Sequence, residues 1–404
     1  MRWSGLGFTF LITVLTLQYY VLINGFWSKA EVQVSNTNWA DTHIDVYLSN
    51  EYTTTVDSLG NTLVGGFKCA LALNIIFAAV GGRAGPLEGV LIVIIGTIFY
   101  ELNRQILTLF SVDHGGSMTI FEFGGVAGSI VSILLTLTTQ KNIIGFNSYY
   151  TSKKHVATIT MIGTTFIWLF LPVLNTDIPS SLFIYSNAGI STLYSTCACL
   201  ATVMGITLTL EGKLSYRDMI TAPIAGGIII GSSASYIYNP LESFMLGILA
   251  AIVQILFNRL EQKKSGKPLW CNGVLSLFAV QGFLGGLFSA VMRAIHRTVQ
   301  GYDTAYYSLP SKFVYDQGGQ ITGTFVTLGI AIATGIILYI VISAVNQEKE
   351  ENLYKDRAYW LTDHDGISVI KPQSDNDDKM TEPREDMDVD VSEGKGHKDE
   401  AAYL

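Results

Sequence analysis

The sequence predicts an all-α protein that crosses a membrane about ten times. Only 14% of its 404 residues are charged, whereas soluble domains carry about 25%. Its mean hydropathy is +0.37, and 49% of its residues are apolar. The apolar residues gather in ten stretches, each near the roughly 20 residues that a helix needs to span a bilayer. This composition excludes an ordinary cytosolic enzyme.

The ten stretches follow one another along most of the chain. The first is not followed by a small-residue cleavage site, so it predicts a membrane helix and not a signal peptide. Small residues such as Gly226 and Gly282 lie along one side of several stretches, and ordinary close packing of membrane helices explains most of them. The predicted spans are residues 5–26, 63–82, 86–110, 116–138, 155–175, 188–209, 218–237, 240–259, 271–295 and 320–346.

Positive charges indicate the orientation of these spans. The loops after the second, fourth, sixth and eighth spans hold most of the loop Lys and Arg, beginning with Arg83 and Lys141. The alternate loops are poorer in both residues. Because insertion keeps such charges on the cytoplasmic side, ten spans with this bias place both termini in the cytoplasm.

The end of the chain differs in composition from the rest. Residues 348–404 contain 17 Asp and Glu against 8 Lys and Arg, a net charge of −9. A segment this polar cannot bury enough apolar surface to fold alone, so we expect a disordered cytoplasmic tail. The sequence therefore predicts two regions: a transmembrane domain over 1–347 and an acidic tail over 348–404.

The sequence carries no pattern of a catalyst or a metal site. It has no nucleophile-base arrangement and no phosphate-binding loop. Its four cysteines lie within or beside apolar stretches without metal-ligand spacing, so we expect small buried thiols and assign no disulfide. No region is basic enough to bind nucleic acid. We expect no enzyme activity, no cofactor and no nucleic-acid partner.

One motif carries a specific resemblance. Residues Asp113–Phe121 read DHGGSMTIF, which resembles the Rhesus signature of the ammonium transporter and Rhesus glycoprotein family, in which an Asp opens a pore helix and a pore-lining His lies eight residues later. Further stretches resemble the family in the same order: residues 5–11, 161–172, 212–227 and 354–360. The resemblance runs from residue 1 to about residue 360.

This resemblance implies both architecture and activity. It implies two halves of inverted topology with a pathway between them, one pore in each protomer, and a homotrimer or a heterotrimer with related subunits. It also implies a channel for ammonia or ammonium, with carbon dioxide as a further neutral substrate, in lipid of the plasma membrane or an endomembrane. Family members of this type have eleven or twelve helices, and Met1 aligns after the first one or two, which we expect this chain to lack.

The central pore positions depart from the family. Two histidines, one from each half, meet in mid-pore in the family and share a proton; here the positions are Phe121 and Phe278. The six histidines of the chain all fall in predicted loops, helix ends or the tail, so no other pair replaces them. A phenyl ring can neither donate, accept nor titrate as imidazole does. We expect no proton relay through the pore centre.

Three further positions match the family's pore. Phe67 matches one Phe of the outer hydrophobic gate, and Leu174 stands where the family has the second. A packed core aromatic is the alternative for Phe67. Asp113 can accept the free N–H groups at a helix N-terminus, and the resemblance gives the same carboxylate a structural part in shaping the outer mouth.

Two charged residues stand beside proposed pore positions. Lys68 and Glu122 fall inside predicted spans, where ionisable groups usually face a bundle interior or a cavity. Adjacent helical residues point about 100° apart, so neither need line the pore. We favour snorkelling for Lys68, and an interhelical hydrogen bond or a subunit contact for Glu122, over a new ion site.

Two hypotheses for the function remain open at this point. The first is a channel that passes neutral ammonia, carbon dioxide or both without carrying current. The second is a non-conducting subunit of a membrane complex, whose Phe121 and Phe278 close the lumen and whose acidic tail docks a partner. Resemblance constrains architecture more than activity.

Overall fold

A computed structural model describes residues 3–27, 30–35, 43–48, 56–138, 154–176, 182–263, 273–296 and 317–345. All of them belong to one compact unit, Met1–Trp360. The predicted acidic tail over 348–404 and Cys271 lie outside the described residues.

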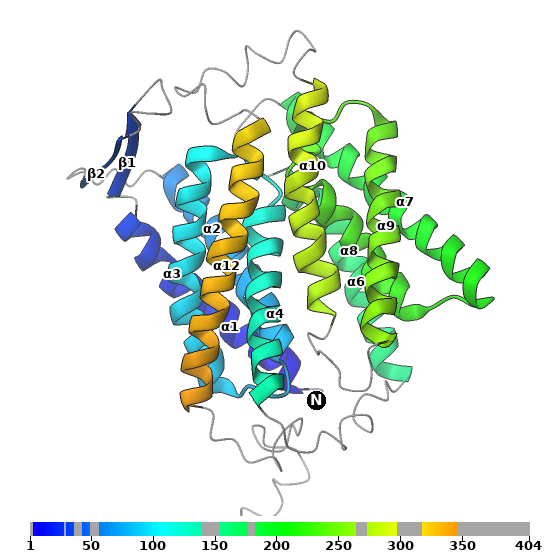
Figure 1. The fold of residues 1–404 in the computed structure, drawn as a ribbon, viewed down its shortest axis with the longest axis horizontal. Coiled ribbons are helices and arrows are strands. Elements are labelled where there is room, and N and C mark those ends of the chain that lie inside the picture. The colour runs from blue at the N-terminus through cyan, green and yellow to red at the C-terminus, as the bar shows by residue number, and fades with distance from the viewer. Residues whose placement is uncertain are drawn as a thin grey trace, which may run out of the picture. The chain divides into compact units, whose positions relative to one another are not determined.

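Each of the ten predicted spans contains a helix (Figure 1). Nine helices in the described part of the chain are long and apolar enough to cross a membrane, which confirms the all-α multi-pass class. The segments are α1 (Trp3–Trp27), α2 (Val56–Val80), α3 (Pro86–Phe110), η1 (Ser117–Glu122) running into α4 (Phe123–Thr138), α6 (Lys154–Asn175), α7 (Leu182–Glu211), α8 (Tyr216–Ile230), α9 (Pro240–Lys263), η4 (Leu275–Ala279) running into α10 (Val280–His296), and α12 (Gln317–Val345).

The seventh predicted span, 218–237, is wrong as a single helix. α8 ends at Ile230, and the chain continues through a turn into the short 3₁₀ helix η3 (Ala234–Tyr236). The turn is held by bonds to a distant segment: Gly231 O accepts from the backbone N of Gly115 at 3.3 Å, and Ser232 Oγ donates to Asp113 Oδ1 at 2.5 Å. Non-helical backbone is tolerated at membrane depth where it is buried in protein, as this turn is.

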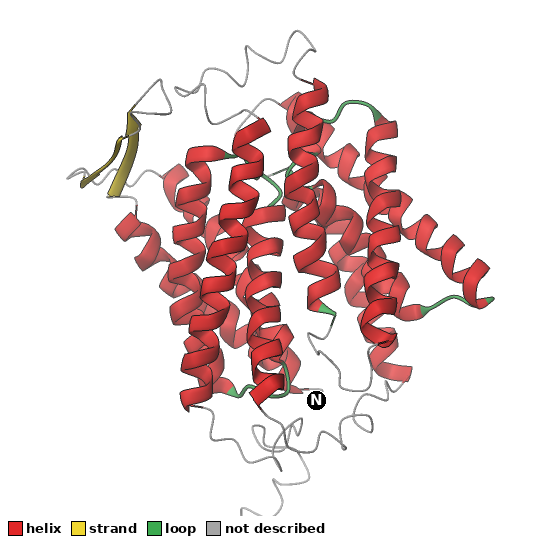
Figure 2. Cartoon of the chain, in the orientation of Figure 1, coloured by secondary structure: helices red, strands yellow, loops and turns green. Residues whose placement is uncertain are grey.

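Two short strands, which the sequence did not predict, follow α1 (Figure 2). β1 (Ala30–Ser35) and β2 (His43–Leu48) pair antiparallel, with Ala30 opposite Leu48 and Ser35 opposite His43. They lie in the connection between the first two predicted spans, outside the membrane segments.

The helices form two packed groups that meet along a shared boundary. One buried apolar cluster is drawn mainly from α1–α4 and α12, and a second from α7–α10. Figure 1 shows the first group in blue, cyan and orange and the second in green and yellow. Ile224 and Phe278 pack against both clusters, so they mark the boundary.

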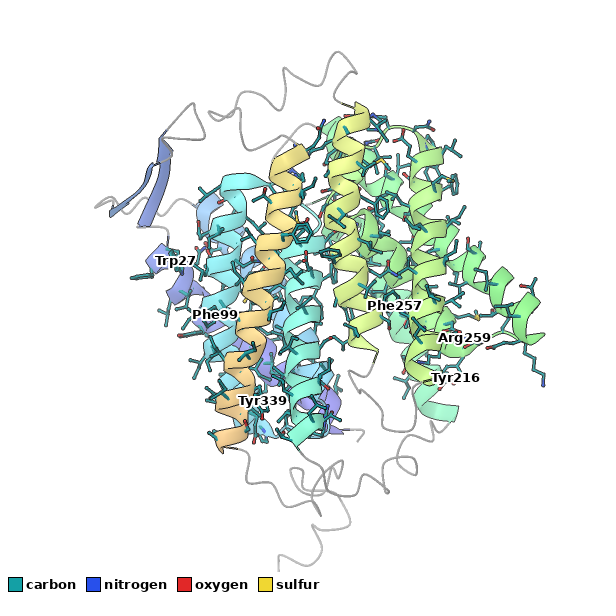
Figure 3. All side chains as sticks on the ribbon, viewed as in Figure 1. Trp27, Phe99, Tyr216, Phe257, Arg259 and Tyr339 are labelled. Atoms are coloured by element: carbon teal, nitrogen blue, oxygen red, sulfur yellow. The ribbon has the colours of Figure 1, made fainter. Side chains whose placement is uncertain are left out.

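The outer faces of the bundle are strongly apolar, as a lipid-facing surface requires. Large apolar side chains stand exposed along α1 and α6, among them Phe10, Leu22, Phe166 and Phe170. Charges gather near helix ends, where Arg259 of α9 pairs with Glu211 at the end of α7. Figure 3 shows Arg259 near Tyr216, the first residue of α8.

Candidate functional site

The structure brings the two central positions together. Phe121 and Phe278 face each other with ring centroids 6.0 Å apart and ring planes within 7° of parallel. This separation is typical of interacting aromatic pairs. Phe121 is only 3% exposed, and Phe278 is partly buried at the boundary between the two helix groups. The pair fills the place where the two halves of the chain meet.

The two rings occupy equivalent places in two similar segments. Phe121 belongs to the π-helix η1, which leads into α4, and Phe278 belongs to the π-helix η4, which leads into α10. A π-helical turn is wider than an α-helical one and is often found at functional sites. The packing is reciprocal, since η1 lies against α10 and η4 lies against α4. Each half thus presents its ring from the same kind of element.

A glycine four residues after each ring makes this approach possible. A Cβ on Gly125 would collide with the backbone of Ala279, and a Cβ on Gly282 would lie 2.6 Å from Ser117 O. No side chain larger than hydrogen fits at either position. The sequence signal was a phenylalanine and a glycine four residues apart in both halves, which sequence reasoning missed by treating Gly282 as ordinary packing.

Asp113 organises the start of η1. Its Oδ2 accepts hydrogen bonds from the backbone N of Met118 at 3.0 Å, from the backbone N of Thr119 at 2.7 Å and from Thr119 Oγ1 at 2.9 Å. Its Oδ1 accepts from Ser232 Oγ. One carboxylate therefore satisfies free N–H groups of η1 and ties η1 to the turn after α8, a link between the two halves.

The two gate positions do not join the ring pair equally. Leu174 of α6 packs against the apolar cluster that contains Phe121. Phe67 of α2 is 57% exposed and lies in an apolar stripe with Leu63 and Leu71, at the four-residue spacing of one helix face. The structure thus places Leu174 against the apolar core of the first helix group and Phe67 on an exposed face.

The two charged neighbours of the proposed pore positions have different surroundings. Lys68 Nζ donates to the backbone O of His114 at 3.0 Å. Glu122 is fully buried within a single chain, which rules out a subunit contact, and neither carboxylate oxygen has a hydrogen-bond partner in the described part of the chain. The favoured interpretations of Glu122 are therefore wrong.

No histidine described with its side chain replaces the pair. His114 offers its backbone oxygen to Lys68, and His296 Nε2 lies 2.7 Å from Glu242 Oε2 at the far end of α10. Among the described residues no group of three or more His, Cys, Asp or Glu is placed to hold a metal ion. The centre of the site is therefore apolar.

Comparison with known proteins identifies the family of this chain. Residues 1–359 match the sequence profile described as Ammonium Transporter Family. The chain is 27% identical over 399 residues to ammonium transporter Rh type C of Bos taurus, covering 94% of this chain and 81% of that one. Its fold resembles the solved structures of Rh50 from Nitrosomonas europaea, with a TM-score of 0.59, 24% identity and coverage of 74% of this chain and 75% of that one, and of Mep2 from Saccharomyces cerevisiae, with a TM-score of 0.59, 17% identity and coverage of 85% and 77%.

We predict that Gly282→Ala lowers stability and Gly163→Ala does not. A methyl group at 282 must push apart the backbones of the two halves, which costs about 1–3 kcal/mol in a well-packed interior. A Cβ at 163 meets nothing within 4 Å. Thermal unfolding of the purified proteins in detergent measures both. Equal melting temperatures for the two variants would contradict the tight contact at 282.

We predict that Asp113→Ala destabilises the protein more than Ser232→Ala. The first change leaves two backbone N–H groups and two hydroxyls without their acceptor, and each buried donor left unpaired costs about 1–3 kcal/mol. The second change removes one of these hydroxyls and leaves the bonds to η1 in place. The same unfolding measurement tests this, and an equal loss in both variants would show that Asp113 does not hold η1.

Proposed function

Since the chain belongs to the Ammonium Transporter Family, we propose that it is a Rhesus-type membrane channel for ammonia. The proteins that it resembles in sequence bear the name ammonium transporter Rh type B or C. The resemblance covers the membrane-spanning helices, including both ring-bearing segments. The family is one of transporters, so this chain is not proposed to be an enzyme.

The observation that carries the proposal is the stacked pair of Phe121 and Phe278. A cation at the centre of a bilayer costs at least about 2.5 kcal/mol, and far more where nothing solvates it. The two phenyl rings offer no hydrogen-bond acceptor at this point of the proposed pathway. Neutral ammonia and carbon dioxide carry no charge, so neither needs such an acceptor in order to pass. The proposed flux is therefore passive, carries neutral gas and moves no net charge.

The remaining positions have supporting roles in this proposal. Asp113 holds η1 in place beneath the outer mouth, and Leu174 narrows the approach to the rings from the side of α6. Phe67 stands near the middle of α2 with an exposed ring, and its part as a gate residue is carried over from the family motif alone. Transport would depend on Asp113 through the position of η1 and not through contact with the gas.

The proposal also specifies assembly and placement. Residues 1–347 form the membrane domain, and 348–404 form a cytoplasmic tail. Three copies of the chain, or this chain with related subunits, assemble in the lipid of the plasma membrane or an endomembrane. The exposed apolar faces of α1 and α6 supply the surface for lipid and for neighbouring subunits.

A second function is favoured by the same rings. Phe121 is almost completely buried and packs against Phe278, so the pair can also act as a plug. The chain would then be a non-conducting subunit that lends its scaffold to a membrane complex.

We predict that proteoliposomes containing the natural protein take up ammonia and carbon dioxide faster than empty liposomes, without a current. Internal pH followed by stopped flow measures each gas, and a planar bilayer measures the current. A substrate-dependent current would contradict neutral transport.

The variant that carries both Phe121→His and Phe278→His separates the two functions. Flux in the natural protein means a working gas channel without imidazole. Flux only in the double variant means an intact scaffold closed by phenyl rings, which would replace the channel by the structural subunit.

A further inference from the structure

Among the buried polar side chains that lack a partner in the described part of the chain, three lie on neighbouring helices. Asn103 of α3, Glu122 of η1 and Thr327 of α12 are each 0% exposed. Within the described part of the chain, none of their five side-chain oxygen and nitrogen atoms has a hydrogen-bond partner. Buried polar groups are almost always paired, because an unmade hydrogen bond costs free energy. Three such residues together call for a common explanation.

Neighbouring contacts put all three within about one helical turn of one another in depth. A Cβ on Gly323 would lie 2.5 Å from Ser111 Oγ and 2.9 Å from Leu107 Cδ2, so Gly323 lies between the levels of these two residues of α3. Thr324 Oγ1 donates to Met118 Sδ at 3.3 Å, which brings η1 to the same level. Asn103 lies four residues deeper in the membrane than Leu107, Thr327 four deeper than Gly323, and Glu122 four deeper than Met118. Four residues are one helical turn, or about 6 Å.

The helix faces point the three side chains toward one another. Residues three and four apart share a face, so Asn103 lies on the face that Leu107 turns to α12, and Glu122 on the face that Met118 turns to α12. Thr327 follows both Gly323, which meets α3, and Thr324, which meets η1, so it points between these two elements. By this spacing the three side chains lie on the faces that α3, η1 and α12 turn toward one another.

The contact below them closes the space. Tyr100 of α3 and Phe123 of α4 meet edge to face with ring centroids 5.9 Å apart. These residues are three positions below Asn103 and one below Glu122. Phe121, by contrast, turns to Phe278. The polar group therefore lies beside the ring pair but on another face of η1.

The other half of the chain holds a buried carboxylate, amide and hydroxyl that bond one another directly. Asp218 of α8, Asn258 of α9 and Ser276 of η4 are buried, and Asn258 Nδ2 donates to Asp218 Oδ1 at 2.9 Å while Ser276 Oγ donates to Asn258 Oδ1 at 3.0 Å. Asn103, Glu122 and Thr327 form no such bonds with one another, although they have the same donors and acceptors. Polar groups held too far apart for direct bonds suit a guest between them.

We propose that Asn103, Glu122 and Thr327 form a buried site for one ammonium ion, separate from the ring pair. The Glu122 carboxylate balances the charge of the ion, while Asn103 Oδ1 and Thr327 Oγ1 accept two of its N–H groups. A buried carboxylate is tolerated where it is paired with opposite charge and hydrogen-bonded. The choice of ammonium rests on the proposed function, since it is the protonated form of the proposed substrate; the site itself rests on the unpaired side chains.

Binding is tested with the full chain in lipid nanodiscs, by calorimetric titration with ammonium chloride against sodium chloride and potassium chloride. We predict saturable ammonium binding in the natural protein, no binding in Glu122→Gln, and about tenfold weaker binding in Thr327→Val, since one hydrogen bond to a charged group is lost. Thr334→Val is the matched control. Thr334 is also buried on α12, but its Oγ1 donates to Ile330 O at 2.7 Å, so binding is expected to stay unchanged.

Infrared difference spectra of the natural protein test the site without relying on a variant that must fold. Ammonium is expected to change the carboxylate stretch, and Glu122→Gln to remove that change. A carboxylic acid band that ammonium does not alter would mean that Glu122 carries a proton and no cation, and would overturn the proposal. Equal binding of potassium, or equal weakening in Thr327→Val and Thr334→Val, would overturn it too.

The binding test of the site and the flux test of the channel can contradict their proposals independently. Gas flux together with ammonium binding that is unaffected by Glu122→Gln overturns the site and leaves the channel. Binding that depends on Glu122 without any flux supports the site and overturns the channel.

Discussion

The contact between the two halves at η1 and η4 is the constraint on which the rest of the site depends. Gly125 and Gly282 let the backbone of each half touch the π-helical segment of the other. A side chain at either position would separate the halves and, with them, Phe121 and Phe278. In a membrane, where lipid is as apolar as the helix surfaces, such close packing supplies much of the association between helices. The ring geometry is thus a consequence of backbone contact.

Polar bonds complement this contact at the start of η1. Asp113 ties the start of η1 to Ser232, and Ser117 Oγ donates to Ile228 O at 2.7 Å while accepting from the backbone N of Ser232 at 2.8 Å. These bonds satisfy the backbone where α8 ends early. A turn at this depth needs such partners, because no water is available to it in the hydrocarbon region. The break in α8 and the position of η1 therefore depend on each other.

Much of the fold could be predicted because the membrane imposes a length and a composition on each span. The ten apolar stretches gave the helices nearly to their ends. The break in α8 could not be predicted, because Gly231 and Ser232 are acceptable in a membrane helix and only the distant residues Gly115 and Asp113 hold them in a turn. The strands β1 and β2 were not predicted, because each has only six residues and lies between two apolar spans.

The sequence predicts those parts of the site that follow from the order of the family motifs along the chain. Phe121 and Phe278 lie 157 positions apart, and only the alignment of both motifs with the family indicated that they would meet, as the structure shows. Phe67 shows the limit, since a motif match does not say which face of α2 turns inward. Glu122 shows the limit again, because its backbone packs against Gly282, a residue 160 positions later in the chain.

The two halves differ in how the polar side chains beside their rings are paired. Ser276 of η4 donates to Asn258 Oδ1 at 3.0 Å, whereas neither carboxylate oxygen of Glu122 in η1 has a hydrogen-bond partner in the described part of the chain. An unpaired buried carboxylate is among the most costly groups that a protein can hold, and replacing it by an apolar residue would relieve that cost. We therefore expect the charge of Glu122, one residue from Phe121, to bind a cation. Phenylalanine stands at the ring position in both halves, and only the half that holds η1 has an ionisable side chain directly after it. In the site proposed above, a cation would be held at Glu122, beside the apolar path proposed for a neutral gas.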